Sequence, residues 1–176
     1  MPRPRAARRA PREAGLQDEL LFFEEKHDSS EEYLEALTML EQDGVTLAQV
    51  TEVARMVHVK PPSAVQMLKR LAGRGLVKYL DREGVHLTAK GRRVGRRMVR
   101  NGRLMEVFLT DTLKIPLDIK LAHTVEHAMT DAFANALCGF MGHPARCPHG
   151  YEIPAGTCCP ERRERPERPE RPGRAI

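Results

Sequence analysis

Apolar residues recur along the first half of this chain with the spacing of helices. Those between Ser29 and Gly44 follow that spacing, and Ser29 with Glu32 fits a capping box, which predicts a first helix that ends at Gly44. Residues 47–57 repeat the pattern and predict a second helix. A third helix is expected to begin at Pro61-Pro62, because the missing amide donor of proline costs nothing in a first turn.

The pattern then changes to that of strands. Residues 76–80 and 85–87 are rich in Leu and Val, and the turn-forming run 81–84 separates them, which predicts a β-hairpin. A helix-turn-helix followed at once by a hairpin is typical of a winged-helix domain. The hairpin would be its wing.

Two longer helices are predicted after the hairpin. The first is capped by Thr88, runs to about Leu113 and is softly broken at Gly102; the second runs from Asp118 to about Phe140. One stripe of the second helix is apolar and consists of Ala122, Val125, Met129, Ala132, Phe133 and Ala136. The predicted fold is therefore mainly α, with a winged helix-turn-helix domain followed by a helical dimerisation domain.

The predicted organisation has five segments. Residues 1–27 form a basic, partly disordered arm with the start of the first helix, 28–100 the winged helix-turn-helix domain, 101–141 the helical domain, 142–160 a Cys/His/Pro-rich segment, and 161–176 a disordered Glu-Arg-Pro tail. The sequence has no run of 18 apolar residues, and the arm lacks the apolar core of a signal peptide. We expect a cytoplasmic protein without a membrane span.

The distribution of charge along the chain indicates a binding partner. Thirteen Lys and Arg residues lie between positions 60 and 103 against only Asp81 and Glu83, although the net charge of the whole chain is only +5. Such a block on a third helix and its wing predicts binding to double-stranded DNA. Gln can pair with adenine, Ser can contact a base or a phosphate, and cations neutralise phosphates. The predicted DNA-binding residues are Lys60, Pro62, Ser63, Gln66, Lys69, Arg70 and Arg82. The arginines from Arg92 to Arg103 could follow phosphates or simply solvate their helix.

His123, Glu126 and His127 are spaced i, i+3 and i+4, so their side chains converge on one face of a helix. Imidazole with carboxylate is a ligand set for first-row metals, although histidines paired with a Glu for structural reasons fit the spacing equally well. Glu32 and Glu35, spaced i, i+3 on the first helix, and Glu106, near the end of the long one, become candidate ligands only if the fold brings them to His123.

All four cysteines fall within a short segment: Cys138, Cys147, Cys158 and Cys159, with His143 and His149 between them. Clustered thiols in an intracellular protein indicate a metal centre more than disulfides. A four-thiolate iron–sulfur cluster is slightly favoured over Zn²⁺, and redox-active thiols stay open as a third reading.

Four separated motifs resemble one known family. They are SSEEYL at 29–34, PPSAVQML at 61–68, LTAKG at 87–91 and EHAMTD at 126–131, and in this order they resemble the DtxR/MntR (iron/manganese-dependent repressor) family of metalloregulators, over about residues 28–154. The family consists of homodimeric winged-helix repressors activated by Fe²⁺ or Mn²⁺. The resemblance implies metal ligands at Glu32, Glu35, His123, Glu126 and His127, and operator contacts from Pro62 and Gln66.

The resemblance also implies a second group of metal ligands, which includes two histidines. This chain has Gly102 and Ile119 at those two positions, so only Glu106 remains of the second group. The sequence also ends before an SH3-like third domain could fit, so it resembles a short form. We expect a DNA-binding transcriptional regulator that depends on Fe²⁺ or Mn²⁺ and represses genes of metal uptake or metal homeostasis. The alternative is an iron–sulfur or redox sensor acting through the cysteines. An enzyme is not expected, because His-x-x-Glu-His differs from the zincin order His-Glu-x-x-His.

Overall fold

The structure, a computed structural model, describes residues 29–159. The arm predicted for 1–27 and the tail predicted for 161–176 lie outside these residues. The elements are α2 Ser29–Gln42, α3 Val50–Met56, α4 Pro61–Gly73, β1 Val77–Leu80, β2 Gly84–Leu87, α5 Ala89–Val107, the π-helical turn η1 Phe108–Thr112, α6 Ile119–Ala128 and α7 Asp131–Phe140. The mainly helical fold with one hairpin is the one predicted.

The first core joins α2, α3, α4 and the hairpin. Leu34, Leu37 and Leu68 are among the side chains that are almost wholly buried there. The helices predicted at α2 and α4 are confirmed, but α3 begins three residues later than expected. Residues 47–49 are extended instead, because Ala48 forms a β-bridge with Val85 at the edge of the hairpin.

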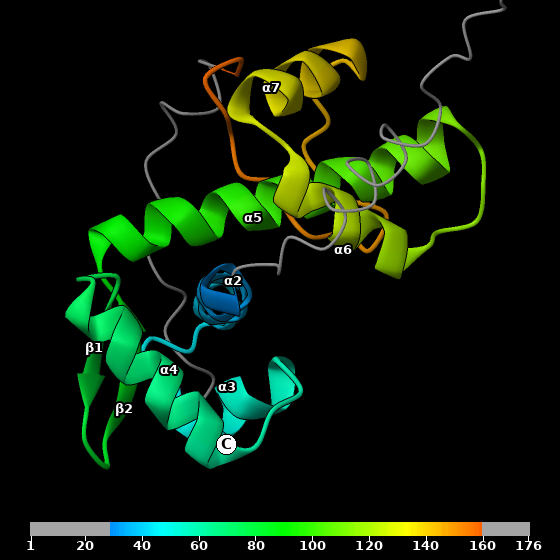
Figure 1. Cartoon of the computed structure of the whole chain (residues 1–176). Helices are drawn as coiled ribbons and strands as arrows, with labels where there is room; N and C mark the ends of the chain where they lie inside the picture. Colours follow the sequence, from blue (N-terminus) through cyan, green and yellow to red (C-terminus); the bar gives the residue numbers. More distant parts are fainter. Residues whose placement is uncertain (1–28, 160–176) are drawn as a thin grey trace, which may run out of the picture.

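The hairpin is short and antiparallel. Val77 pairs with Leu87 and Leu80 pairs with Gly84, which leaves residues 81–83 as the turn. Arg82 adopts a left-handed backbone conformation at this tip, with a φ of 64°. The predicted wing is therefore confirmed, and its tip projects beyond the first core (Figure 1).

Helix α5 connects the two halves of the molecule. It starts at the hairpin, passes over α2 and continues between α6, which lies below it in Figure 1, and α7, which lies above it. Thr88 caps it by accepting a hydrogen bond from the amide of Gly91. The predicted soft break at Gly102 is wrong, because α5 runs through that residue without interruption. The expected domain boundary at 100/101 thus falls inside one continuous helix.

The second core joins the end of α5, α6, α7 and the irregular segment 141–159, whose Ile153 is only 1% exposed. The single helix predicted for 118–140 is wrong. Met129 is extended, and Thr130 caps a new helix by accepting a hydrogen bond from the amide of Phe133. The break turns α7, so that Phe133 is half exposed while Ala134 and Leu137 face the core. No helix among residues 29–159 is long and apolar enough to cross a membrane.

Candidate metal centre and nucleic-acid interface

Helices α2 and α6 bring five of the predicted ligands together. Donor atoms of Glu32, His123 and His127 lie within 4.8 Å of one another, and so do those of Glu35, His123 and Glu126. His123 belongs to both sets and joins them into one cluster. Because α2 belongs to the first core and α6 to the second, this cluster spans the junction of the two domains.

Glu126 is the most deeply placed carboxyl group of this cluster, with only 3% of its surface exposed. Its Oε1 lies 2.7 Å from Nδ1 of His123 but makes no hydrogen bond of acceptable geometry within the described residues. Burial, together with the nearby charge of Glu35, raises the pKa of Glu126 to about 9. Burial also raises the pKa of Glu35. Each of the two carboxyl groups contributes to the pKa shift of the other, and the pair is expected to share a proton when no cation is bound.

Glu31 contacts the candidate site but was not among the residues predicted from the sequence. Its Oε2 lies 3.0 Å from Nδ1 of His127, and its Oε1 accepts a hydrogen bond of 2.7 Å from Nη2 of Arg97 on α5. The hydrogen bond with His127 and the charge of Arg97 lower the pKa of Glu31, although burial opposes the shift. An ionised Glu31 fixes the ring of His127 so that Nε2 is directed to the cluster.

Gly102 gives the cluster its space. A cavity of about 160 Å³ lies beside α5, and its lining includes Gly102, Glu35, His123 and Glu126. A Cβ atom on residue 102 would lie 2.1 Å from Oε2 of Glu126. The glycine that departs from the family's pattern therefore lets the carboxylate of Glu126 approach the backbone of α5.

We expect Gly102→Ala to lower the affinity for Mn²⁺ at least about tenfold, because the new methyl group displaces the carboxylate of Glu126. Isothermal titration of the full chain measures this. The matched control is Gly73→Ala at the end of α4, where a Cβ would meet no atom within 4 Å. Equal Mn²⁺ affinities for Gly102→Ala and the parent would show that metal binding does not depend on the close contact between the carboxylate of Glu126 and the backbone of α5.

Glu106 takes a different place from the one predicted. It lines the same cavity as Glu35 and Glu126, but its nearest donor atoms are those of Cys147 and His149, all within 4.8 Å of one another. Nδ1 of His149 lies 3.2 Å from Oε2 of Glu106. The structure thus separates Glu106 from the five-residue cluster and gives it an imidazole and a thiol as neighbours.

The four cysteines do not meet. Cys147 lies with Glu106, whereas Cys138, Cys158 and Cys159 gather around His143. The predicted four-thiolate iron–sulfur centre is therefore not supported, because an irregular loop carries one of its four thiols to another place. Burial and the neighbouring thiols raise the pKa of Cys138 to about 12. Burial opposes the ionisation of Cys159, but hydrogen bonds with Cys158, Cys138 and His143 outweigh it and lower the pKa of Cys159 to about 7.

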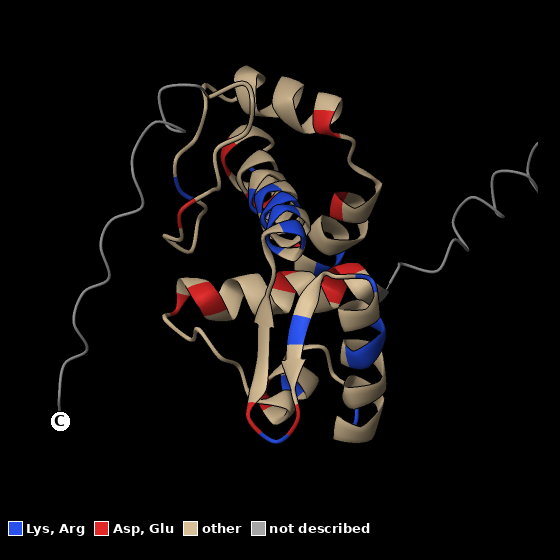
Figure 2. Cartoon of the chain, turned by 90° about the vertical axis from the view of Figure 1, so that its left-hand side faces the viewer, with Lys and Arg blue, Asp and Glu red and all other residues tan. Residues whose placement is uncertain are grey.

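The predicted DNA-binding side chains are all exposed. They lie at the N-terminal end and along the outer face of α4, apart from Arg82 at the hairpin tip, and comprise Lys60, Pro62, Ser63, Gln66, Lys69, Arg70 and Arg82. Nζ of Lys69 lies 5.8 Å from the centre of the Tyr79 ring of the hairpin. Figure 2 shows this basic face of α4 beside the hairpin, whose tip also carries Asp81 and Glu83. Most of the predicted DNA-binding cations therefore lie on or beside α4 rather than at the wing tip.

Several arginines counted in the basic block serve the fold instead. Arg92 forms a bidentate pair with Glu41 of α2, with both distances 2.8 Å. Arg100 and Arg103, predicted on the outside of the helix, are only 6% and 7% exposed. Among the predicted row on α5, Arg93, Arg96 and Arg97 are exposed, and Arg97 pairs with Glu31 of α2. The count of Lys and Arg residues between positions 60 and 103 therefore overestimates the number of cations that are available to DNA.

A winged helix joined by one long helix to a second helical domain, with carboxylates and imidazoles gathered at the junction, defines a class: DNA-binding regulators that respond to a metal ion. Residues 27–85 match the iron dependent repressor N-terminal DNA binding domain, and residues 88–155 match the iron dependent repressor metal binding and dimerisation domain. The chain belongs to the iron-dependent repressor family, which confirms the resemblance. Members of this family are transcriptional repressors and not enzymes.

Individual relatives agree with this assignment. The chain is 31% identical over 131 residues to the diphtheria toxin repressor of Corynebacterium diphtheriae, which covers 72% of this chain and 57% of that protein. It is 30% identical over 117 residues to an uncharacterized HTH-type transcriptional regulator of Methanocaldococcus jannaschii, covering 64% of this chain and 92% of that protein. The structure of the manganese regulator SloR matches with a TM-score of 0.63 at 31% identity, over 72% of this chain and 60% of SloR. The chain thus spans little more than half of several curated relatives.

Proposed function

We propose that this protein is a cytoplasmic, homodimeric repressor whose affinity for operator DNA depends on Fe²⁺ or Mn²⁺, and that it controls genes of metal uptake or metal homeostasis. The observation that carries the proposal is the cluster of Glu32, Glu35, His123, Glu126 and His127, because its donors come from both domains. Neither α2 nor α6 offers a complete ligand set alone.

The chemistry of the donors fits the proposed ions. They are carboxylate oxygens and imidazole nitrogens only, a set suited to Mn²⁺ or Fe²⁺. The buried Oε1 of Glu126, which lacks a well-formed hydrogen bond within the described residues, offers an acceptor toward the cavity. When bound, the cation supplies the positive charge that two buried carboxylates need in order to ionise side by side.

The side chains couple this site to the DNA-binding surface. Glu32 and Glu35 hold α2 at the cluster, and α2 packs against the other elements of the winged-helix domain. Glu31 ties His127 of α6 to Arg97 of α5 through two hydrogen bonds. Closing the cluster therefore fixes the angle between the winged helix and the second domain. A ligand that favours this closed arrangement shifts the population toward the state that fits DNA.

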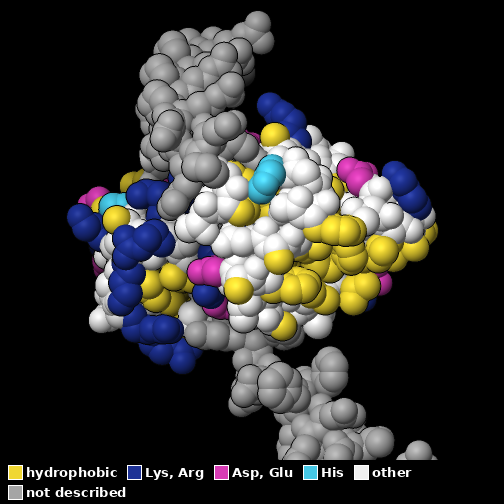
Figure 3. All heavy atoms as spheres, turned by 90° about the horizontal axis from the view of Figure 1, so that it is seen from above, with side chains coloured by type: hydrophobic (Ala, Val, Ile, Leu, Met, Phe, Trp, Pro, Cys, Tyr) yellow, Lys and Arg dark blue, Asp and Glu magenta, His cyan; other side chains and the backbone are white. Residues whose placement is uncertain are grey.

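An exposed apolar surface supports the proposed homodimer. Large hydrophobic side chains of α6, α7 and the loop before α6 lie at the surface, namely Leu113, Ile115, Ile119, Leu121, Phe133 and Phe140. Figure 3 shows hydrophobic side chains gathered toward the right end of the molecule, whereas most of the Lys and Arg on this face form a row at the left end. A second copy packed on the apolar end would leave both winged helices free for two half-sites of one operator.

The test begins with a randomised pool of DNA duplexes, from which the full chain selects its preferred sequence in the presence of Mn²⁺. Binding of that sequence is then measured by fluorescence anisotropy with Mn²⁺, with Fe²⁺ under anaerobic conditions, and with a chelator. We expect the metal to tighten binding by about 5–150-fold. The variant His127→Ala should remain dimeric and bind with the weak affinity of the metal-free parent under every condition. Equal affinities of the parent with metal and with chelator would refute the proposed regulation.

A further inference from the structure

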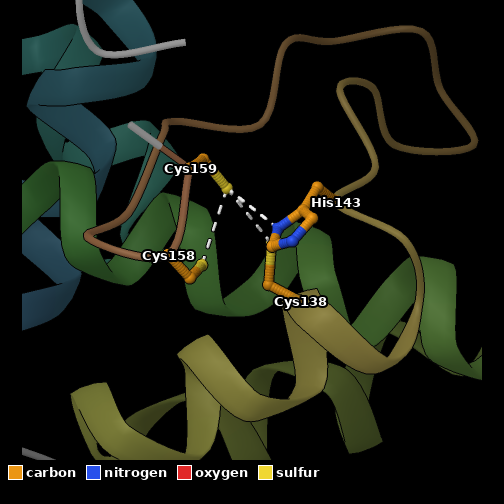
Figure 4. Close-up of side chains that lie close together, drawn as sticks. All are labelled: Cys138, His143, Cys158 and Cys159. Atoms are coloured by element: carbon orange, nitrogen blue, oxygen red, sulfur yellow. Dashed lines mark hydrogen bonds between the residues drawn. The ribbon is translucent and has the colours of Figure 1, made fainter. Parts of the chain in front are cut away.

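Cys138, His143, Cys158 and Cys159 form a second cluster of donor atoms, which shares no residue with the cluster on α2 and α6. Cys138 lies near the end of α7, His143 follows the helix, and Cys158 and Cys159 return to it from the end of the described chain (Figure 4). Their four donor atoms all lie within 4.8 Å of one another. Three thiols and an imidazole that converge on one point form a ligand set for a soft or borderline cation.

Four of the six distances between these donor atoms are close to the edges of a small tetrahedron, and all six are within 4.8 Å. Zn–S bonds of about 2.3 Å and a Zn–N bond of about 2.0–2.1 Å place two sulfurs about 3.7 Å apart and a sulfur and a nitrogen about 3.6 Å apart. Sγ of Cys159 lies 3.6 Å from Sγ of Cys138 and 3.5 Å from Sγ of Cys158. Nδ1 of His143 lies 3.6 Å from Sγ of Cys138 and 3.3 Å from Sγ of Cys159. We propose that these four residues bind one Zn²⁺ ion in a closed, structural Cys₃His site.

The surroundings of the cluster suit an anionic zinc–thiolate group. Three thiolates and one Zn²⁺ carry a net negative charge, and Nη2 of the buried Arg100 lies 3.2 Å from Sγ of Cys158. The same nitrogen donates to Oδ1 of Asn135 on α7, whose Nδ2 donates to Oγ1 of Thr157. A cation and a ring of hydrogen bonds thus orient the segment that carries two of the ligands.

Gly156 lets this segment reach Arg100. A Cβ atom at residue 156 would lie 2.5 Å from Nη2 of Arg100, so no other residue type allows the same approach without a shift. On the opposite side, His143 has a left-handed φ of 58°, which brings its ring back toward Cys138 after the end of α7. The glycine at position 156 and the left-handed backbone of His143 thus both bring donor atoms to one point. A metal site with fixed geometry requires such convergence.

Two other uses of these thiols fit the geometry less well. A disulfide would join two sulfurs and leave the third thiol and His143 without a role, whereas all four groups converge. Only in a [4Fe–4S] cluster does each thiolate bind a separate iron atom, and sulfurs as close as these do not fit that arrangement. A four-thiolate [2Fe–2S] cluster would need a fourth cysteine, and Cys147 lies elsewhere. A single tetrahedral ion explains both the number of donors and their spacing.

The proposed ion would fasten residues 156–159 to α7 and, through Arg100, to α5. It would be permanent rather than regulatory, because all four ligands lie beyond α5 in the C-terminal half and none comes from the winged helix. The proposal does not rest on the metal dependence of DNA binding. Either proposal can fail while the other stands.

The test uses the full chain purified under reducing conditions, with its zinc content measured after dialysis against a mild chelator. We expect about one zinc per chain for the parent and for Cys147→Ser, and at least about tenfold less zinc for Cys158→Ser and for His143→Ala. Cys147→Ser is the matched control, since Cys147 is a buried thiol of the same segment outside the cluster. His143 is exposed and Cys158 is half-buried, so the chain is expected to tolerate both changes.

Cobalt provides the second measurement. Co²⁺ in a Cys₃His site gives thiolate-to-metal charge-transfer bands and the intense visible bands of tetrahedral coordination. We expect both in the parent and in Cys147→Ser, and their loss in Cys158→Ser. The proposal is overturned if Cys158→Ser and His143→Ala retain zinc like the parent. It is also overturned if the parent contains iron with acid-labile sulfide, a disulfide between these cysteines, or no metal and freely titrating thiols.

Discussion

Replacing Glu126 by Gln is expected to abolish the response of DNA binding to metal and, at the same time, to stabilise the metal-free protein above neutral pH. The amide keeps the size and the hydrogen-bonding capacity of the carboxyl group toward Glu35 but removes the charge that a cation requires. We expect the affinity for Mn²⁺ to fall at least about 100-fold. Operator binding, measured by anisotropy with Mn²⁺ and with chelator, should then be weak and equal under both conditions.

The stability effect follows from the pKa of Glu126, which burial raises from 4.5 to about 9. Because the folded state holds this proton more tightly than the unfolded state, the protonated carboxyl group contributes stability that is full below about pH 4.5. That contribution is lost as the pH rises toward 9, by as much as about 1.4 kcal/mol per pH unit. A glutamine has no proton to lose, so the advantage of Glu126→Gln over the parent should grow with pH across this window.

Urea unfolding in chelator at pH 6 and pH 8 measures this difference, and comparison with the parent cancels groups that titrate equally in both proteins. The control is Glu83→Gln, which makes the same chemical change at an exposed position of the hairpin turn in the first domain. A variant with the same pH dependence as the parent, or one that still responds to Mn²⁺, would show that Glu126 is not the buried acid of the site.

Local signals explain why the first domain could be predicted. Pro61-Pro62 marks the start of α4, and the run 81–84 marks the hairpin turn, so neither feature depends on distant contacts. The break between α6 and α7 has a local signal too, since Thr130 followed by Asp131 is a typical helix start. The prediction missed it because the apolar spacing of Ala122, Val125 and Met129 continues up to the break.

The site required tertiary information. The spacing of His123, Glu126 and His127 indicated one half of the cluster, but only the packing of both α2 and α6 against α5 shows which acids complete it. Glu31 contacts a histidine 96 positions away, and nothing in its local sequence distinguishes it from its neighbours. The thiols were grouped wrongly for the same reason, because spacing cannot reveal the path of an irregular loop. Summing charges along the chain likewise ignored the pairing of α5 arginines with α2 acids.

We expect different residues on the outer face of α4 to recognise the DNA sequence and to attract DNA of any sequence. Gln66 is exposed on this helix, and glutamine can form two hydrogen bonds with adenine in the major groove. With Mn²⁺ present, Gln66→Ala should weaken binding to the selected DNA by about 1–3 kcal/mol and relax the preference at one base position, with little effect on random DNA. The measurement is anisotropy on the selected duplex, on single-base variants and on random duplex.

Arg70→Ala is expected to behave differently, because an exposed guanidinium on the same helix attracts phosphates of any sequence. It should weaken binding to selected and random DNA alike and reduce the slope of log affinity against log salt by about one. Lys120→Ala, which removes an exposed cation from α6 in the other domain, is the matched control and should change neither property. If Gln66→Ala and Arg70→Ala lower the affinities for selected and random DNA by equal factors, α4 does not read the operator in this way.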